Sequence, residues 1–129
     1  MKSIQFKFLY FLLGLISLLW VSESWAYESQ TTDGVSNIVI LAPKQGEILP
    51  AGGEVQVVYQ FTRGKKDNGN HVHIYLDGKN EGTTRRSPRV LGKLNPGKHT
   101  VLLKISNQDH EWVNVEATVQ FEVSSQLPR

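Results

Sequence analysis

The chain has 129 residues, with 14 lysines and arginines against 12 aspartates and glutamates, so its formal net charge is +2. This near balance gives no global reason to expect nucleic acid as a partner. The chain contains no cysteine, which excludes a disulfide framework and a lipid anchor on a cysteine, so packing alone must hold the fold.

The N-terminus has the pattern of a secretory signal peptide. Lys2 and Lys7 precede an almost wholly apolar run over residues 8–21, and Ser24-Trp25-Ala26 places small residues where a signal peptidase reads them. The run is about 14 residues long, whereas a membrane-spanning helix needs about 20. We therefore expect cleavage after Ala26, a mature chain of 129 − 26 = 103 residues, a periplasmic or secreted location, and no stable membrane span after cleavage.

The first third of the mature chain contains two predicted strands. Residues 27–36 are polar and without periodicity, which predicts a flexible leader. An apolar run over residues 37–42 predicts the first strand, and a proline- and glycine-rich stretch follows it. Residues 54–62 alternate between apolar and polar side chains, as a strand with one buried face does.

The remaining strands follow in the second half of the chain. Residues 71–76, 89–94, 98–106 and 112–123 are each predicted to be extended, and the polar segment 79–88 has room for one short edge strand. Turn signals such as Asp-Gly and Asn-Pro-Gly separate them.

No segment of the mature chain has helical periodicity. About seven short strands in about 100 residues are typical of an all-β, Ig-like antiparallel β-sandwich. We expect this single domain to cover residues 37–123 and a tail to cover residues 124–129.

The stretch HVHIYLDG, residues 71–78, is the chemically unusual part of the chain. Its apolar residues share one face of the strand, and two imidazoles lie one pleat apart on the other face. The inward set is Val72, Ile74 and Leu76, and the outward set is His71, His73, Tyr75 and Asp77.

A third histidine is expected to approach this pair. In the Ig-like strand order, the strand over residues 98–106 lies antiparallel beside the strand over residues 71–76, so His110 in the following loop comes near His71. Imidazole suits Cu(II), Zn(II) or Ni(II). The sequence thus predicts a copper or zinc site made by His71, His73 and His110, with Asp109 as a ligand or an orienting group.

Other interpretations of these histidines stay open. The strand face could be polar and solvated, or the imidazoles could sense pH or contact another ligand. The basic loop over residues 63–70 opposes a cation, and without a cysteine or a nearby methionine a tight Cu(I) site is not expected. His99, at the far end of its strand, is expected to have a structural role near the Pro96-Gly97 turn.

An interaction surface is the alternative function. Tyr75 and Trp112 are expected on the outer sheet face, where they could dock a partner protein or a glycan, unless Trp112 only folds over the end of the sheet. Arg85, Arg86 and Arg89 form a basic cluster that either is solvated or binds a polyanion. No Gly-x-Ser-x-Gly or phosphate-loop motif is present, so we expect a non-catalytic protein.

The second half of the chain also resembles a known group of domains. IYLDG (74–78), LGKLNPGKHT (91–100) and the final long strand resemble Ig-like and PEGA-like modules of exported bacterial proteins. Some small exported domains of this kind carry His-x-His on the first of these strands and Asp-His after the penultimate one, as residues 71–73 and 109–110 do here. The resemblance implies an Ig-like fold and an association with copper or other metals.

Overall fold

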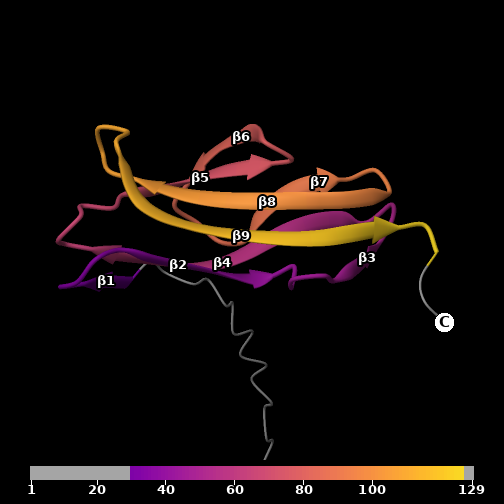
Figure 1. Ribbon diagram of the computed structural model, residues 1–129, viewed down its shortest axis with the longest axis horizontal. Coiled ribbons are helices and arrows are strands. Elements are labelled where there is room, and N and C mark those ends of the chain that lie inside the picture. The colour runs from indigo at the N-terminus through magenta and orange to yellow at the C-terminus, as the bar shows by residue number, and fades with distance from the viewer. Residues whose placement is uncertain (1–29, 127–129) are drawn as a thin grey trace, which may run out of the picture.

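The computed structural model describes residues 30–126. The predicted signal peptide, its cleavage site and the last three residues lie outside this range. Residues 30–126 form β-strands and no helix (Figure 1), and no helix there could cross a membrane. The strands are β1 (Gln30–Thr32), β2 (Asn37–Ala42), β3 (Ile48–Pro50), β4 (Glu54–Gly64), β5 (His71–Leu76), β6 (Lys79–Thr84), β7 (Arg89–Lys93), β8 (Gly97–Ser106) and β9 (Trp112–Ser124).

The strands form two sheets that face each other. One sheet has the order β1–β4–β2, with β7 paired to β4, and the other has the order β3–β9–β8–β5–β6. Figure 1 shows the two layers, with β8 and β9 running along one of them and β2 and β4 along the other. The predicted all-β sandwich is confirmed, with nine strands in the described range where the sequence predicts about seven.

The two additional strands are short and lie at sheet edges. β1 pairs in parallel with β4, with Gln30 opposite Thr62, so part of the segment predicted to be a flexible leader belongs to a sheet. β3 pairs in parallel with β9 and lies in the proline- and glycine-rich stretch, for which the sequence predicts no strand. Three residues are too few to show alternation. Pro50 ends the edge strand β3, where its missing N–H breaks no ladder.

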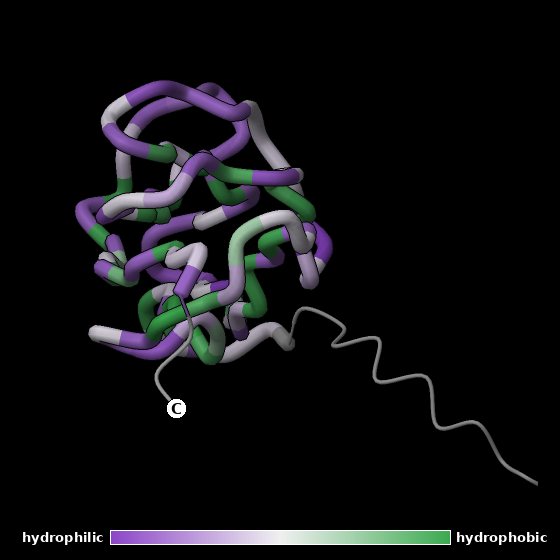
Figure 2. Tube along the Cα trace, turned by 90° about the vertical axis from the view of Figure 1, so that its right-hand side faces the viewer, coloured by the Kyte–Doolittle hydropathy of each residue, from purple (hydrophilic) through white to green (hydrophobic). Residues whose placement is uncertain are grey.

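The core is formed by the inward residues of the long strands. Figure 2 shows hydrophobic and hydrophilic residues alternating along the chain, as strands with one buried face require. Each fully buried aliphatic side chain contributes about 1.5–3 kcal/mol of transfer free energy. The core consists of Ile38, Val55, Val57, Tyr59, Phe61, Val72, Ile74, Val101, Leu103, Ile105, Val119, Phe121 and Val123.

The order of three strands fixes the place of the histidines. β8 lies between β5 and β9, as predicted, and pairs antiparallel with both. His71, at the start of β5, is therefore opposite Ser106, at the end of β8. An irregularity in the β8–β9 ladder then places Trp112 opposite the same serine. The start of β5 and the β8–β9 loop thus share one end of the sandwich.

Candidate metal centre

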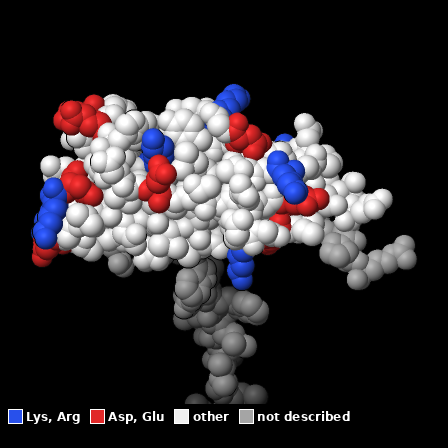
Figure 3. All heavy atoms as spheres, in the orientation of Figure 1, with Lys and Arg blue, Asp and Glu red and all other residues white. Residues whose placement is uncertain are grey.

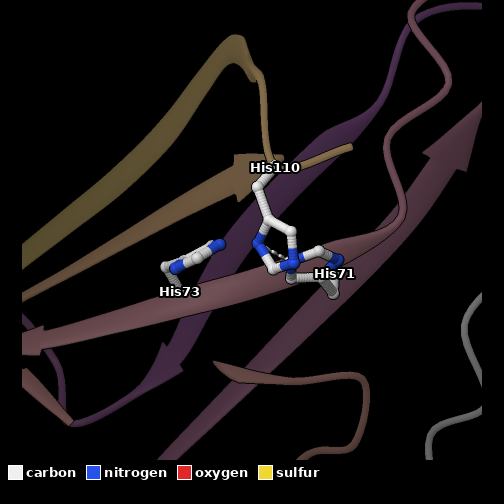
Figure 4. A group of neighbouring side chains, drawn as sticks. All are labelled: His71, His73 and His110. Atoms are coloured by element: carbon white, nitrogen blue, oxygen red, sulfur yellow. Dashed lines mark hydrogen bonds between the residues drawn. The ribbon is translucent and has the colours of Figure 1, made fainter. Parts of the chain in front are cut away.

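Three histidines converge at that end of the sheet. His71 and His73 project from β5, and His110 reaches them from the β8–β9 loop (Figure 4). One possible ligand atom from each residue lies within 4.8 Å of those of the other two. The ring centroid of His71 lies 5.0 Å from that of His73 and 4.7 Å from that of His110. The structure thus brings together the three histidines that the sequence places near one another.

The closest pair of ring nitrogens has the spacing of two ligands on one ion. His71 Nε2 and His110 Nδ1 are 3.3 Å apart. Two imidazole nitrogens bound to one tetrahedral zinc ion, each at about 2.0–2.1 Å, are separated by about 3.3 Å. This spacing is compatible with the two nitrogens binding one metal ion, and His73 supplies the third member of the group.

The protonated nitrogen of His71 is fixed by its neighbours. Asn70 Oδ1 accepts a hydrogen bond from Arg85 Nη2 and lies 3.2 Å from His71 Nδ1. A guanidinium group can only donate hydrogen bonds, so the side-chain atom of Asn70 that faces Arg85 must be the amide oxygen. His71 Nδ1 contacts the same oxygen and must therefore carry the proton of that hydrogen bond. The lone pair of His71 consequently lies on Nε2, the nitrogen next to His110.

Ser106 joins the two histidines of β5. Its hydroxyl lies 2.9 Å from His71 Nε2 and 3.1 Å from His73 Nε2, and the residue has no exposed surface. Ser106 is not among the site residues that the sequence predicts. The antiparallel register of the two strands could have indicated this residue, because it puts the last outward residue of β8 opposite the first outward residue of β5.

His73 has a ring nitrogen without a partner. In the described part of the chain, its Nδ1 is buried and makes no hydrogen bond. The indole of Trp112 lies against the ring at a centroid distance of 4.8 Å, and Lys104 Nζ lies 4.4 Å from the indole centroid. An unpaired buried polar atom costs about 1–3 kcal/mol, so its occurrence among three imidazoles points to a ligand.

Burial distinguishes this cluster from a solvated strand face. His71 is 7% exposed and His73 is 9% exposed, so the interpretation of these two residues as a solvated polar face is wrong. Burial lowers the pKa of both imidazoles below 6.5, and the neighbouring histidines lower it further, with Arg85 adding to the effect at His71 and Lys104 at His73. Both rings are therefore neutral at pH 7, which is the form that binds a metal ion.

The loop that carries His110 is built around Asn107. The side-chain oxygen of Asn107 accepts the backbone N–H groups of Asp109 and Glu111, each at 2.9 Å, and its backbone N–H donates to the carbonyl of Glu111 at 2.9 Å. His110 adopts a φ of 65°, a conformation that is uncommon for residues other than glycine. The turn directs the His110 side chain toward β5.

The predicted fourth metal residue lies elsewhere in this loop. Asp109 is exposed and lines a different cleft, together with Arg63 and Lys65. Its carboxylate is not part of the group of convergent ligand atoms in residues 30–126. The Asn107-centred turn explains this placement, because adjacent residues in a tight turn direct their side chains apart.

The loop before β5 is held by a buried serine. Ser36 Oγ donates to Asp67 Oδ1 at 2.7 Å and accepts the N–H of Gly64 at 2.9 Å, and the Ser36 N–H donates to Asp67 Oδ2 at 2.7 Å. A Cβ on Gly69 would lie 2.0 Å from Ser36 Oγ. This tight arrangement fixes the chain two residues before His71.

The fourth histidine has a separate, structural role. His99 Nε2 donates to the carbonyl of Asn95 at 2.8 Å, and His99 Nδ1 lies 2.7 Å from Asp77 Oδ2. Burial alone would lower the pKa of His99, but the hydrogen bonds to Asn95 and Asp77 outweigh it and raise that pKa above 6.5. The predicted bond near the Pro96-Gly97 turn is present.

The two aromatic residues of the predicted docking surface have different surroundings. Trp112 is 43% exposed at the edge of the histidine cluster. Tyr75 is partly buried farther along β5, opposite Leu102 of β8. Tyr75 is on β5 and Trp112 is on β9, the two strands that flank β8. Trp112 is the more accessible of the two residues.

Comparisons with known proteins support the fold. The chain is similar to the fibronectin(III)-like modules of Clostridium thermocellum CbhA, with a TM-score of 0.53 and 17% identity, covering 67% of this chain and 94% of that chain. It also matches a Jonesia denitrificans lytic polysaccharide monooxygenase with a TM-score of 0.44 and 16% identity, covering 64% of this chain and 60% of that chain. The first likeness supports an Ig-like β-sandwich, and no functional conclusion follows from the second. No protein-family model and no curated protein matches the sequence.

Proposed function

We propose that this protein is an exported, non-catalytic module that binds a divalent transition-metal ion through His71, His73 and His110. The observation that carries the proposal is the convergence of three imidazoles, two of them buried, one of which has a ring nitrogen without a partner in the described residues. Buried polar atoms are almost always paired in folded proteins. A bound ion would supply what the cluster lacks.

The ligand set favours Cu(II) or Zn(II). Imidazole nitrogen binds both ions well, and affinity for divalent metals rises toward copper. Three histidine ligands leave a further coordination position open, which exogenous ligands or water can fill. The mature chain has no sulfur ligand, because its sequence lacks cysteine and its single methionine is residue 1.

The test is a metal titration that resolves individual histidines. We expect Cu(II) or Zn(II) to bind at one equivalent and, with diamagnetic Zn(II), to shift the NMR signals of all three cluster histidines together. His73→Gln should weaken binding at least tenfold, because one of three ligands is lost. His99→Gln is the matched control and should bind the metal as the wild type does. Equal affinity in the wild type and the His73 variant would refute the proposal.

The second candidate function is docking of a partner protein or a glycan by the face that carries Tyr75 and Trp112. The observation in its favour is the exposed part of the Trp112 indole, because aromatic side chains of this kind anchor interfaces and stack on sugars. Under this hypothesis Trp112→Ala abolishes partner binding and His73→Gln does not. Loss of binding in both variants would instead favour a partner that recognises the metal-loaded site.

A further inference from the structure

A cleft opens directly beside two of the three histidines. Its volume is about 530 Å³, within the range of small-molecule sites. The residues around it carry hydroxyl, amide, imidazole and guanidinium groups but no carboxylate. The lining consists of Asn70, His71, Thr83, Thr84, Arg85, Arg86, Gln108 and His110.

The two arginines of this cleft stand on a segment that is tied to the core. The buried Tyr59 donates its hydroxyl to the carbonyl of Arg86 at 2.8 Å, and its backbone N–H donates to Ser87 Oγ at 2.9 Å. Thr84 Oγ1 donates to the same Arg86 carbonyl at 3.1 Å. The backbone that presents both guanidinium groups is therefore held in place by a core strand, β4.

The positive charge of these arginines is not neutralised within residues 30–126. Neither Arg85 nor Arg86 forms an ion pair with a carboxylate in that range. Asp109, the acidic residue of the same loop as His110, lines the neighbouring cleft with Arg63 and Lys65. Figure 3 shows basic and acidic groups interspersed over the face of the molecule that it presents.

A metal ion bound by the three histidines beside this cleft would favour an anion as a further ligand. Three neutral imidazoles leave the full charge of a divalent ion in place, and two guanidinium groups beside it raise its electrostatic energy. The ion also has a free coordination position. An oxyanion satisfies both demands, since one oxygen can bind the metal and another can accept charge-assisted hydrogen bonds from arginine.

We infer that the cleft binds a small oxyanion, such as a carboxylate, which completes the coordination of the metal held by His71, His73 and His110 and pairs with Arg85 and Arg86. This inference rests on the proposed metal-binding function and names the ligand class that the site takes with its metal. Carboxylate and phosphate groups share the required chemistry, because in each of them at least two oxygens on one atom share negative charge. The cleft has room for a dicarboxylate of the size of malonate.

The test measures metal affinity with and without an anion. Zn(II) is titrated into the purified protein in a non-coordinating buffer, then with malonate and separately with phosphate, and affinity is expressed against the free ion to correct for chelation in solution. We expect one of the two anions to tighten the wild-type affinity by about tenfold or more, the size of effect that charge-assisted contacts give. The anion that does so identifies carboxylate or phosphate as the source.

Two variants and a control assign the effect to the cleft. Arg86→Gln is the cleaner variant, because the hydrogen bonds of Arg86 in the described residues involve only its backbone. Arg85→Gln also removes the contact with Asn70. Both should lose most of the enhancement by the anion, and Arg86→Gln should bind Zn(II) alone as well as the wild type or better. Lys98→Gln, at the opposite end of β8, should keep the enhancement.

The failures of the two proposals are distinguishable. Zn(II) binding that is unaffected by either anion, or an enhancement that is equal in wild type and Arg86→Gln, overturns the oxyanion site and leaves the metal site intact. No Zn(II) or Cu(II) binding under any of these conditions overturns the metal site itself.

Discussion

Replacing Ser106 by alanine should destabilise the metal-free protein and strengthen its metal binding. The hydroxyl contacts the Nε2 atoms of His71 and His73 at 2.9 and 3.1 Å in a fully buried position. Its removal leaves buried ring nitrogens with fewer partners, at a cost of about 1–3 kcal/mol in the free energy of unfolding. The single lone pair of His71 Nε2 cannot serve both the hydroxyl and a metal ion, so this contact exists only without metal.

The expected change in metal affinity follows from the competition between the Ser106 hydroxyl and the metal ion for His71 Nε2. Binding to the wild type must break the Ser106–His71 hydrogen bond, which contributes about 1 kcal/mol net. In Ser106→Ala that cost is absent, so the dissociation constant for Zn(II) should fall by roughly fivefold.

Urea unfolding with and without Zn(II), together with calorimetric titration, measures both quantities. Ser87→Ala is the matched control: it removes a hydroxyl that accepts the backbone N–H of Tyr59, so it should lower stability without changing metal affinity. Weaker Zn(II) binding by Ser106→Ala would refute the reasoning, because the hydroxyl would then be supporting the loaded site.

Three further outcomes follow from other parts of the fold. Gly69→Ala forces a Cβ to within 2.0 Å of Ser36 Oγ, so it should lower the unfolding free energy by about 1–3 kcal/mol and weaken Zn(II) binding, as urea unfolding and titration would show. The pKa of His99 is raised above 6.5 and the pKa of Asp77 is lowered below 3.8. The loss of unfolding free energy caused by His99→Gln should therefore be largest at a pH between the pKa of Asp77 and the pKa of His99. This loss should shrink as pH rises through the raised pKa of His99, and also as pH falls through the lowered pKa of Asp77. Urea unfolding at a series of pH values checks both. Leu103→Ala, in the core, should cost about 2–5 kcal/mol and lower the melting temperature in a thermal scan without altering metal stoichiometry.

The sequence predicts the long strands because each of them carries its apolar side chains on one face. Apolar and polar residues alternate in sequence along β4, β5, β8 and β9, and a period of two is visible over six or more residues. The antiparallel order of β5, β8 and β9 then places the three histidines together without any side-chain information. β1 and β3 escape prediction because three residues that add to a sheet edge need no apolar face.

The immediate surroundings of the histidines are not visible in the local pattern. The burial of His73 depends on Trp112, which the irregular β8–β9 ladder moves opposite Ser106. Alternation alone assigns His73 to an outward face and says nothing of what covers that face. Asp109 was a plausible ligand by proximity in sequence, but the turn centred on Asn107 directs its side chain elsewhere, and turns of this kind depend on side chain to backbone bonds that period and composition do not reveal.

The way the three histidines are attached divides the site into a rigid and an adjustable part. His71 and His73 stand on β5, which is paired on both sides and packs its opposite face into the core. His110 stands on a five-residue loop between strands, with one unusual backbone angle. The core packing therefore fixes two ligands before any metal arrives, which limits the entropy lost on binding. His110 Nδ1 already lies 3.3 Å from His71 Nε2, close to the separation of two nitrogens around one zinc ion. Any further adjustment of His110 falls on the loop, the element whose movement disturbs the fewest packed residues.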